Sequence, residues 1–174
     1  MKGLIHVYTG NGKGKTTAAV GQVIRALGRG YTVVWLQYCK DIFTNPSGEI
    51  PVLKKLGVKL FQYAPMIPFF NPHVKKERVI KECTKSIAIL KKIFKTKKYS
   101  FVVLDELNVA IANKFISKKS IIKLLKSKPS GIELIITGRG KHTEILNLAD
   151  LVTEMKEIKH PYYKGVSARK GIEY

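Results

Sequence analysis

The sequence predicts an α/β fold, in which a parallel β-sheet is flanked by helices. Two observations support this prediction: short β-rich runs alternate along the chain with helical stretches, and a glycine-rich loop joins the first β-rich run to the first helix. Strands that alternate with helices form right-handed parallel crossovers. At 174 residues, the chain is long enough for one domain, residues 1–174, and too short for two ordinary ones.

The first half of the chain contains three expected strands. GLIHVY at 3–8 is a strand, and after the loop TGNGKGKTT the stretch 18–30 has helical spacing and ends in glycines. YTVVWLQY at 31–38 forms the second strand, residues 39–50 a loop, and VKLFQY at 58–63 the third strand. An irregular segment with three prolines follows the third strand.

The second half begins with an amphipathic helix over residues 74–96. Its apolar positions recur at three- and four-residue spacing, with lysines and an arginine between them: Ile80, Cys83, Ile87, Leu90 and Phe94. FVVLDE at 101–106 is a continuous apolar run that ends in two acids, as expected of a buried parallel strand. A helix at 117–127, a strand at 132–138, a helix at 142–148 and a strand at 151–155 complete the alternation.

The net charge of +20 is the outlying feature of the composition. It is compatible with a solvated lysine surface, with a field that attracts anionic ligands, or with nucleic acid. The excess charge is spread along the chain without a basic tail or an aromatic RNA-binding signature, which disfavours nucleic acid. No apolar run has membrane-spanning length and no charged leader is present, so we expect a cytoplasmic protein. The two cysteines lack metal-ligand spacing.

The strongest local signal is the glycine-rich loop between the first strand and the first helix, which predicts a P-loop. Glycines let backbone N–H groups converge on phosphate oxygens, Lys15 adds a full charge, and the Thr16 hydroxyl is a ligand for Mg²⁺. The strict pattern asks for glycine at position 9, where this chain has Thr9. The candidate nucleotide-binding residues are Gly10, Asn11, Gly12, Lys13, Gly14, Lys15, Thr16 and Thr17.

Two acids at the end of a buried strand are typical of the second motif of a P-loop enzyme. Asp105 and Glu106 are candidates for holding Mg²⁺ with Thr16, and the alternative is ordinary exposed acids at a strand end. Arg139 follows another strand at the same sheet edge, where it either reaches phosphate or lies on the surface. Lys15, Thr16, Glu106 and Arg139 are therefore the candidate catalytic residues.

With these motifs in place, the whole chain resembles the P-loop class of corrinoid adenosyltransferases. The resemblance rests on VYTGNGKGKTTAA, on Gln37 and Lys40 after the second strand, on Gly48-Glu49, and on VVLDELN, TGRG and ADLVTEM. The tail KHPYYKGVSARKGIEY at 159–174 is the discriminating part, because many P-loop proteins share the first motif.

The resemblance implies transfer of the 5′-deoxyadenosyl group of ATP to the Co(I) of a corrinoid, cobalamin or cobinamide, with release of triphosphate in adenosylcobalamin synthesis. It implies ATP bound in the reverse sense over Asn11 to Thr17, Mg²⁺, a homodimer, and an electron donor such as a reduced flavoprotein. Family members often have an aromatic-rich stretch that displaces the lower ligand of the corrinoid. Here the matching segment offers Phe69 and Phe70 as corrinoid-binding candidates, or as side chains that pack on the core.

Two other classes of function fit part of the sequence. A recombinase-like P-loop ATPase acting on nucleic acid fits the P-loop NTPase-like fold and the positive charge, and a non-catalytic nucleotide-binding regulator fits the loop alone. The ATPase would release ADP, faster with DNA or RNA, whereas the adenosyltransferase would release triphosphate only with a reduced corrinoid.

Overall fold

A computed structural model of the chain describes residues 2–69 and 71–174. Its strands are β1 (Ile5–Thr9), β2 (Val33–Tyr38), β3 (Lys59–Tyr63), β4 (Phe101–Asp105), β5 (Glu133–Thr137) and β6 (Leu151–Glu154). Its helices are α1 (Lys15–Leu27), α2 (Glu49–Lys55), α3 (Lys76–Thr96), α4 (Leu107–Ala112), α5 (Lys118–Lys126) and α6 (Thr143–Leu146), followed by the 3-10 turn η1 (Pro161–Lys164). Each expected strand is present, within about two residues of its predicted bounds.

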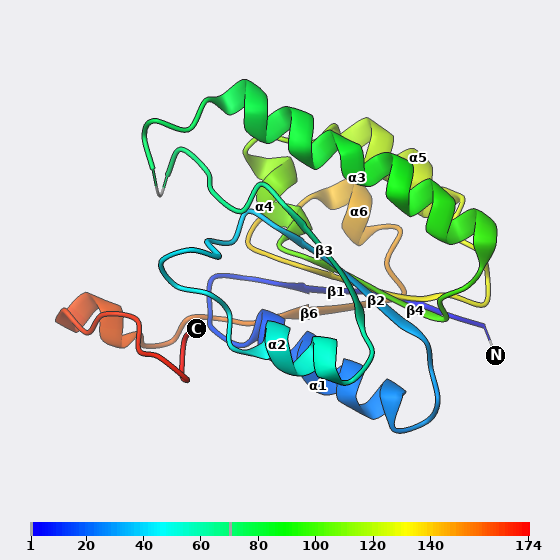
Figure 1. Cartoon of the computed structure of the whole chain (residues 1–174), viewed down its shortest axis with the longest axis horizontal. Helices are drawn as coiled ribbons and strands as arrows, with labels where there is room; N and C mark the ends of the chain where they lie inside the picture. Colours follow the sequence, from blue (N-terminus) through cyan, green and yellow to red (C-terminus); the bar gives the residue numbers. More distant parts are fainter. Residues whose placement is uncertain (1, 70) are drawn as a thin grey trace.

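The strands form one parallel sheet in the order β3-β2-β4-β5-β1-β6, which confirms the predicted α/β class. Figure 1 shows α1 and α2 on one face of the sheet and α3, α4, α5 and α6 on the other. Strands β2, β4 and β5 are buried on both faces, so each face packs its own apolar core.

The two cores lie on opposite faces of the sheet. The larger core includes Leu36, Leu104 and Ile136 of the strands and contacts α3 through α6. The smaller one packs Trp35 and Val103 of the same strands against α1 and α2. Side chains alternate along each strand, which is why neighbouring residues belong to different cores.

Three sequence predictions need correction. The segment 39–50 is not wholly a loop, because α2 begins at Glu49, and the chain adds a short helix, α4, directly after β4. On α3, Ile80 is 37% exposed, whereas Val79 is 1% exposed and packs on the core in its place. The other predicted positions are confirmed, because Cys83, Leu90 and Phe94 are buried and Ile87 packs against the core.

All the strands run in the same direction, so their carboxyl ends share one edge of the sheet. The glycine-rich loop follows β1 at this edge, Lys40 follows β2, Glu106 follows β4, and Arg139 follows β5. Open parallel sheets bind ligands outside this edge, because loops from several strands converge there. The topology therefore collects the predicted site residues in one region.

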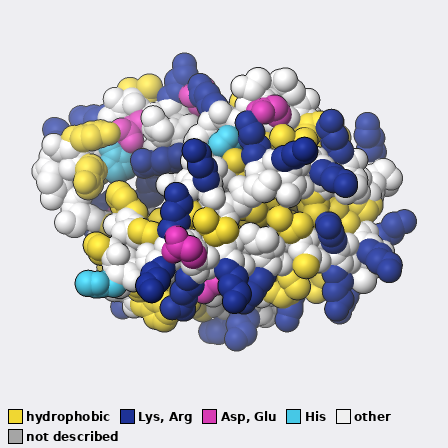
Figure 2. All heavy atoms as spheres, turned by 90° about the horizontal axis from the view of Figure 1, so that it is seen from above, with side chains coloured by type: hydrophobic (Ala, Val, Ile, Leu, Met, Phe, Trp, Pro, Cys, Tyr) yellow, Lys and Arg dark blue, Asp and Glu magenta, His cyan; other side chains and the backbone are white. Residues whose placement is uncertain are grey.

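Lysine and arginine side chains are spread over the surface. Figure 2 shows them distributed across the face that α3 and its neighbours form, with apolar side chains between them. Among the residues that the structure describes, no helix is both long enough and apolar enough to cross a membrane.

Candidate active site

The glycine-rich loop is shaped by its contact with the segment that follows β6. The N–H of Gly12 donates to the carbonyl of Met155 at 2.8 Å, and a Cβ on Gly12 would lie 2.6 Å from the carbonyl oxygen of Lys156. Gly10 has a φ of 98°, and a Cβ there would lie 2.4 Å from the Met155 oxygen. Only glycine fits either position, since a side chain would collide with backbone.

Thr9 has a structural role where the strict motif has glycine. Its side chain is almost fully buried and its hydroxyl donates to the carbonyl of Gly140 at 3.0 Å. This bond ties the start of the P-loop to the loop that carries Arg139. Thr9, the residue that departs from the motif, thus joins two loops of the site and is not part of the cavity lining.

Lys15 is at the amino end of α1, and its side chain folds back over the loop. Its ammonium donates to the carbonyl of Gly12 at 2.6 Å, and the residue is 7% exposed. Burial lowers the pKa of Lys15, and the negative charge of Glu106 opposes that shift. The ammonium is therefore held at the loop with little water around it, where an anion would gain most from its charge.

Asp105 is the centre of the hydrogen-bond network beside the loop. This fully buried carboxylate accepts from the hydroxyls of Thr16 at 2.9 Å and Thr137 at 2.7 Å through Oδ1. Its Oδ2 accepts from the ammonium of Lys40 at 3.0 Å and from the amide of Gln37 at 3.4 Å. Four donors, from α1, β5, β2 and the loop after β2, satisfy this buried charge, as a carboxylate without solvent requires.

Glu106 is the residue just before α4; its backbone is left-handed, with φ 61°, and its side chain lines the cavity. Its N–H donates to Thr137 Oγ1 at 2.9 Å, which fixes this turn. Burial raises the pKa of Glu106 and the adjacent charge of Asp105 raises it further, while Lys40 and Lys15 act in the opposite direction. A non-glycine residue in this conformation is uncommon and is found often at functional sites.

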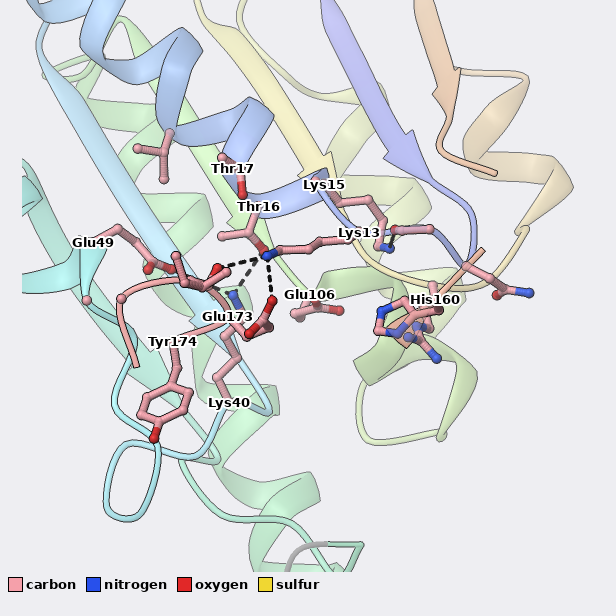
Figure 3. Close-up of a pocket in the computed structure, with 18 residues that line it drawn as sticks. Lys13, Lys15, Thr16, Thr17, Lys40, Glu49, Glu106, His160, Glu173 and Tyr174 are labelled. Carbon is pink, nitrogen blue, oxygen red and sulfur yellow. Dashed lines mark hydrogen bonds and ion pairs between the residues drawn. The ribbon is translucent and has the colours of Figure 1, made fainter. Parts of the chain in front are cut away.

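Lys15, Thr16 and Glu106 line a cavity of about 620 Å³, shown in Figure 3. Its lining carries four cationic side chains: Lys13, Lys15, Lys40 and Arg139. It also carries three carboxylates, those of Glu49, Glu106 and Glu173. The P-loop from Asn11 to Thr17 forms one wall, so the cavity offers backbone amides and positive charge to a polyphosphate.

The carboxyl-terminal tail forms part of the cavity wall. Lys13 of the loop donates to Glu173 and to the carbonyl of Ile172, both at 2.9 Å. Hydrogen bonds from Arg169 and Lys13 lower the pKa of Glu173 to about 2. The main chain of Tyr174 lies 3.8 Å from where a Cβ on Gly48 would sit. The tail thus contacts both the glycine-rich loop, through Lys13, and the amino end of α2, near Gly48.

Comparison with known proteins identifies the family of this chain. The profile of the family described as ATP:corrinoid adenosyltransferase BtuR/CobO/CobP matches residues 1–174. The chain belongs to this family. It is therefore an alkyl-group transferase that adenosylates a corrinoid with ATP as co-substrate, and these matches do not favour the alternative of a nucleic-acid ATPase.

Named relatives agree along nearly the whole chain. The corrinoid adenosyltransferase CobA of Salmonella typhimurium is 38% identical over 173 residues, which are 99% of this chain and 86% of that protein. The corrinoid adenosyltransferase of Escherichia coli is 36% identical with the same coverage. Among solved structures, the flagellar accessory protein FlaH of Methanocaldococcus jannaschii has a TM-score of 0.57 and 14% identity, covering 88% of this chain and 71% of that one. At that identity the likeness concerns the fold alone.

The structure gathers most of the residues that the sequence singled out. Lys15, Thr16, Glu106 and Arg139 all line the cavity, and Asp105 lies directly behind Thr16. Of the predicted loop residues, Gly10 is outside the lining and acts through the backbone turn.

The predicted corrinoid-binding residues, Phe69 and Phe70, are not among the residues that line the cavity in the described part of the chain. Phe69 is 85% exposed and is not among the described residues that line this cavity, and Phe70 lies outside the described residues. The segment that carries Phe69 follows β3, however, so it starts from the same sheet edge as the P-loop.

Several residues of the site had no role assigned from the sequence. Lys40, Glu49, His160, Glu173 and Tyr174 all line the cavity. Lys40, Glu49 and the tail were part of the family resemblance, but nothing in their spacing indicated which chemistry they serve. Thr137 had the only local signal, a polar residue at the end of a buried strand.

Proposed function

We propose that this adenosyltransferase binds ATP in the cavity over the P-loop, with its phosphates on residues 11–17. The observation that carries the proposal is the convergence of four cations and the loop amides on one cavity in a member of this family. We assign the reverse phosphate orientation to the same residues. The whole chain then acts as one domain with one site.

The reaction breaks one bond and forms one bond at the same carbon. Co(I) of the corrinoid attacks the 5′ carbon of ATP with its electron pair, and the bond between that carbon and oxygen breaks. Triphosphate leaves with the bonding electrons, and cobalt is formally oxidised by two electrons. Because the nucleophile belongs to the corrinoid, the protein needs no general base and no activated water.

The protein's task is to stabilise the leaving triphosphate, which gains negative charge as the bond breaks. Lys15 and the loop amides are arranged to accept this charge, and Arg139 faces it from the loop after β5. Lys15 has little exposure to water, which strengthens its interaction with the developing charge. These groups favour the transition state over bound ATP because the charge is largest there.

The oxygen atoms around Thr16 suit Mg²⁺ as ligands. The Thr16 hydroxyl and the Asp105 carboxylate lie 2.9 Å apart, and an ammonium already contacts both, so the position suits a cation. Mg²⁺ prefers one or two carboxylates together with substrate phosphates, which matches this small set of oxygens. We propose that Thr16 and Asp105, together with Glu106 of the cavity lining, hold the ion. When bound, Mg²⁺ would neutralise charge on the triphosphate.

We propose that the corrinoid binds outside the nucleotide cavity, next to the segment that follows β3. We propose that Phe69 or Phe70 covers the lower face of the ring, replacing the lower ligand with hydrocarbon that donates nothing to cobalt. The position of Phe69 supports this role, since its side chain is 85% exposed and its segment follows β3 at the sheet edge that carries the P-loop. We also propose a cytoplasmic homodimer that receives its electron from a reduced donor such as a flavoprotein.

The function is tested by incubating the protein with ATP, Mg²⁺ and chemically reduced cobalamin or cobinamide. The expected products are the adenosylated corrinoid, seen from its optical spectrum, and intact triphosphate in equal amount. A control without corrinoid should give no triphosphate. Release of ADP that rises with added DNA or RNA, and no adenosylated product, would refute the proposal.

A further inference from the structure

Lys40 is directed into the site by the backbone that precedes it. It follows β2 after Cys39, a buried residue with a left-handed φ of 54° whose N–H donates to the carbonyl of Tyr63 at 3.1 Å. This turn at the end of the strand sends the Lys40 side chain toward the P-loop, and only 22% of that side chain is exposed. Its position is therefore fixed by the fold and is unlike that of the surface lysines.

The ammonium of Lys40 contacts oxygen atoms from three different elements. It lies 3.0 Å from the Thr16 hydroxyl, 3.0 Å from Asp105 Oδ2 and 3.8 Å from Glu49 Oε1. Two carboxylates, those of Asp105 and Glu49, therefore pair with the ammonium, and opposite charges at this distance favour its charged form. The side chain is thus a fixed positive charge among the oxygens assigned above to the metal.

We propose that Lys40 is an internal cation that occupies the metal position of the nucleotide-free enzyme and yields it only to a metal that arrives with triphosphate. This inference rests on the metal assignment of the proposed function and adds an order of binding to it. Lys40 is a positioning residue in this account: it holds Thr16 and Asp105 in their arrangement before the substrate binds.

The charges explain why a bare metal ion should be excluded. A divalent ion that enters alone must displace the ammonium and then remain close to it, with no new anion to offset the repulsion. A metal–triphosphate complex carries net negative charge and gives the displaced ammonium new oxygen partners. Glu49, at the first turn of α2, already lies within 3.8 Å of Lys40 and keeps the ammonium at the cavity.

The test measures Mn²⁺ binding without nucleotide, from the loss of the electron paramagnetic resonance signal of the free ion. We expect wild-type protein to bind Mn²⁺ weakly, and Lys40→Met and Lys40→Gln to bind it more tightly by roughly tenfold or more, because the competing charge is removed. Lys13→Met is the matched control, since Lys13 lines the same cavity but pairs with Glu173. It should change the affinity much less.

A second readout covers the stability of the variants. Mn²⁺ without nucleotide should raise the thermal midpoint of Lys40→Gln and leave that of wild type almost unchanged. Equal Mn²⁺ affinity in wild type and both Lys40 variants would overturn the inference, and so would an equal gain in Lys13→Met.

A separate arm tests the metal site on which the inference depends. Because ATP itself chelates Mn²⁺, this arm compares wild type and Asp105→Asn with a protein-free sample at the same ATP and Mn²⁺ concentrations: wild type should bind more of the ion than ATP alone does, and Asp105→Asn should remove that gain. If Asp105→Asn had no effect there, the proposed metal site would fail, whatever the result with Lys40. The two failures are therefore distinguishable.

Discussion

Replacing Thr137 with valine tests whether the Asp105 network holds the site together. Thr137 is fully buried at the end of β5, and its hydroxyl has two partners. It donates to Asp105 Oδ1 at 2.7 Å and accepts from the N–H of Glu106 at 2.9 Å. Valine has the same shape, so the substitution removes these two hydrogen bonds with little change in packing volume.

The magnitude follows from what each partner loses. A hydrogen bond to a buried carboxylate contributes about 1.5–3 kcal/mol, and a buried N–H left without an acceptor costs about 1–3 kcal/mol. Asp105 keeps three other donors, which favours the lower half of these ranges. We therefore expect Thr137→Val to lose about 3 kcal/mol of unfolding free energy, a fall in Tm of about 6–12 °C for a chain of this size.

The assay is urea denaturation of wild type, Thr137→Val and Thr137→Ser, combined with Mg²⁺ titration of the adenosylation rate. Thr137→Ser keeps the hydroxyl and loses one buried methyl group, so its cost should stay near 1 kcal/mol. Thr137→Val should also need more Mg²⁺, because Asp105 and the turn at Glu106 are no longer fixed. A stability of Thr137→Val within about 0.5 kcal/mol of wild type, or equal losses in both variants, would refute the reasoning.

Three further substitutions test other parts of the site. Lys15→Ala should lower turnover by about two to three orders of magnitude, because one such contact supplies ~3–4 kcal/mol in the transition state; wild-type turnover would remove the P-loop from the mechanism. Glu106→Gln should raise the Mg²⁺ requirement, and an unchanged metal titration in both this variant and Asp105→Asn would count against the metal assignment. Phe69→Ala should impair adenosylation from Co(II)cobalamin far more than from prereduced Co(I), whereas equal losses in the two assays would show that Phe69 has no special role at the corrin face.

The sequence was most informative where one local pattern determines one structure. Continuous apolar runs such as FVVLD are too hydrophobic for an exposed element, and they became the central strands. The P-loop has strict backbone requirements, so its glycine pattern predicts both the turn and the binding of phosphate. The alternation of strands and helices then fixed which sheet edge carries the site, even though it did not reveal the strand order.

The features that the sequence could not predict depend on contacts between segments far apart in the chain. The sequence does not show that Lys40 meets Asp105, since their partnership requires β2 to pair with β4. The tail meets the P-loop through Lys13 and Glu173, which are 160 positions apart. Helices α2 and α4 have only seven and six residues, too few for periodicity to identify them. The acceptor of the Thr9 hydroxyl, likewise, is known only once β1 and β5 are neighbours.

The most direct test of the account follows the oxygen atom that bridges the 5′ carbon and the first phosphorus of ATP. ATP carrying a heavy-oxygen label at this bridge is turned over with prereduced corrinoid, and the products are analysed by mass spectrometry. Attack at carbon predicts that all of the label leaves in intact triphosphate and that the adenosyl product carries none. Label retained on the nucleoside, or ADP and phosphate in place of triphosphate, would contradict the assignment of this cavity to adenosyl transfer.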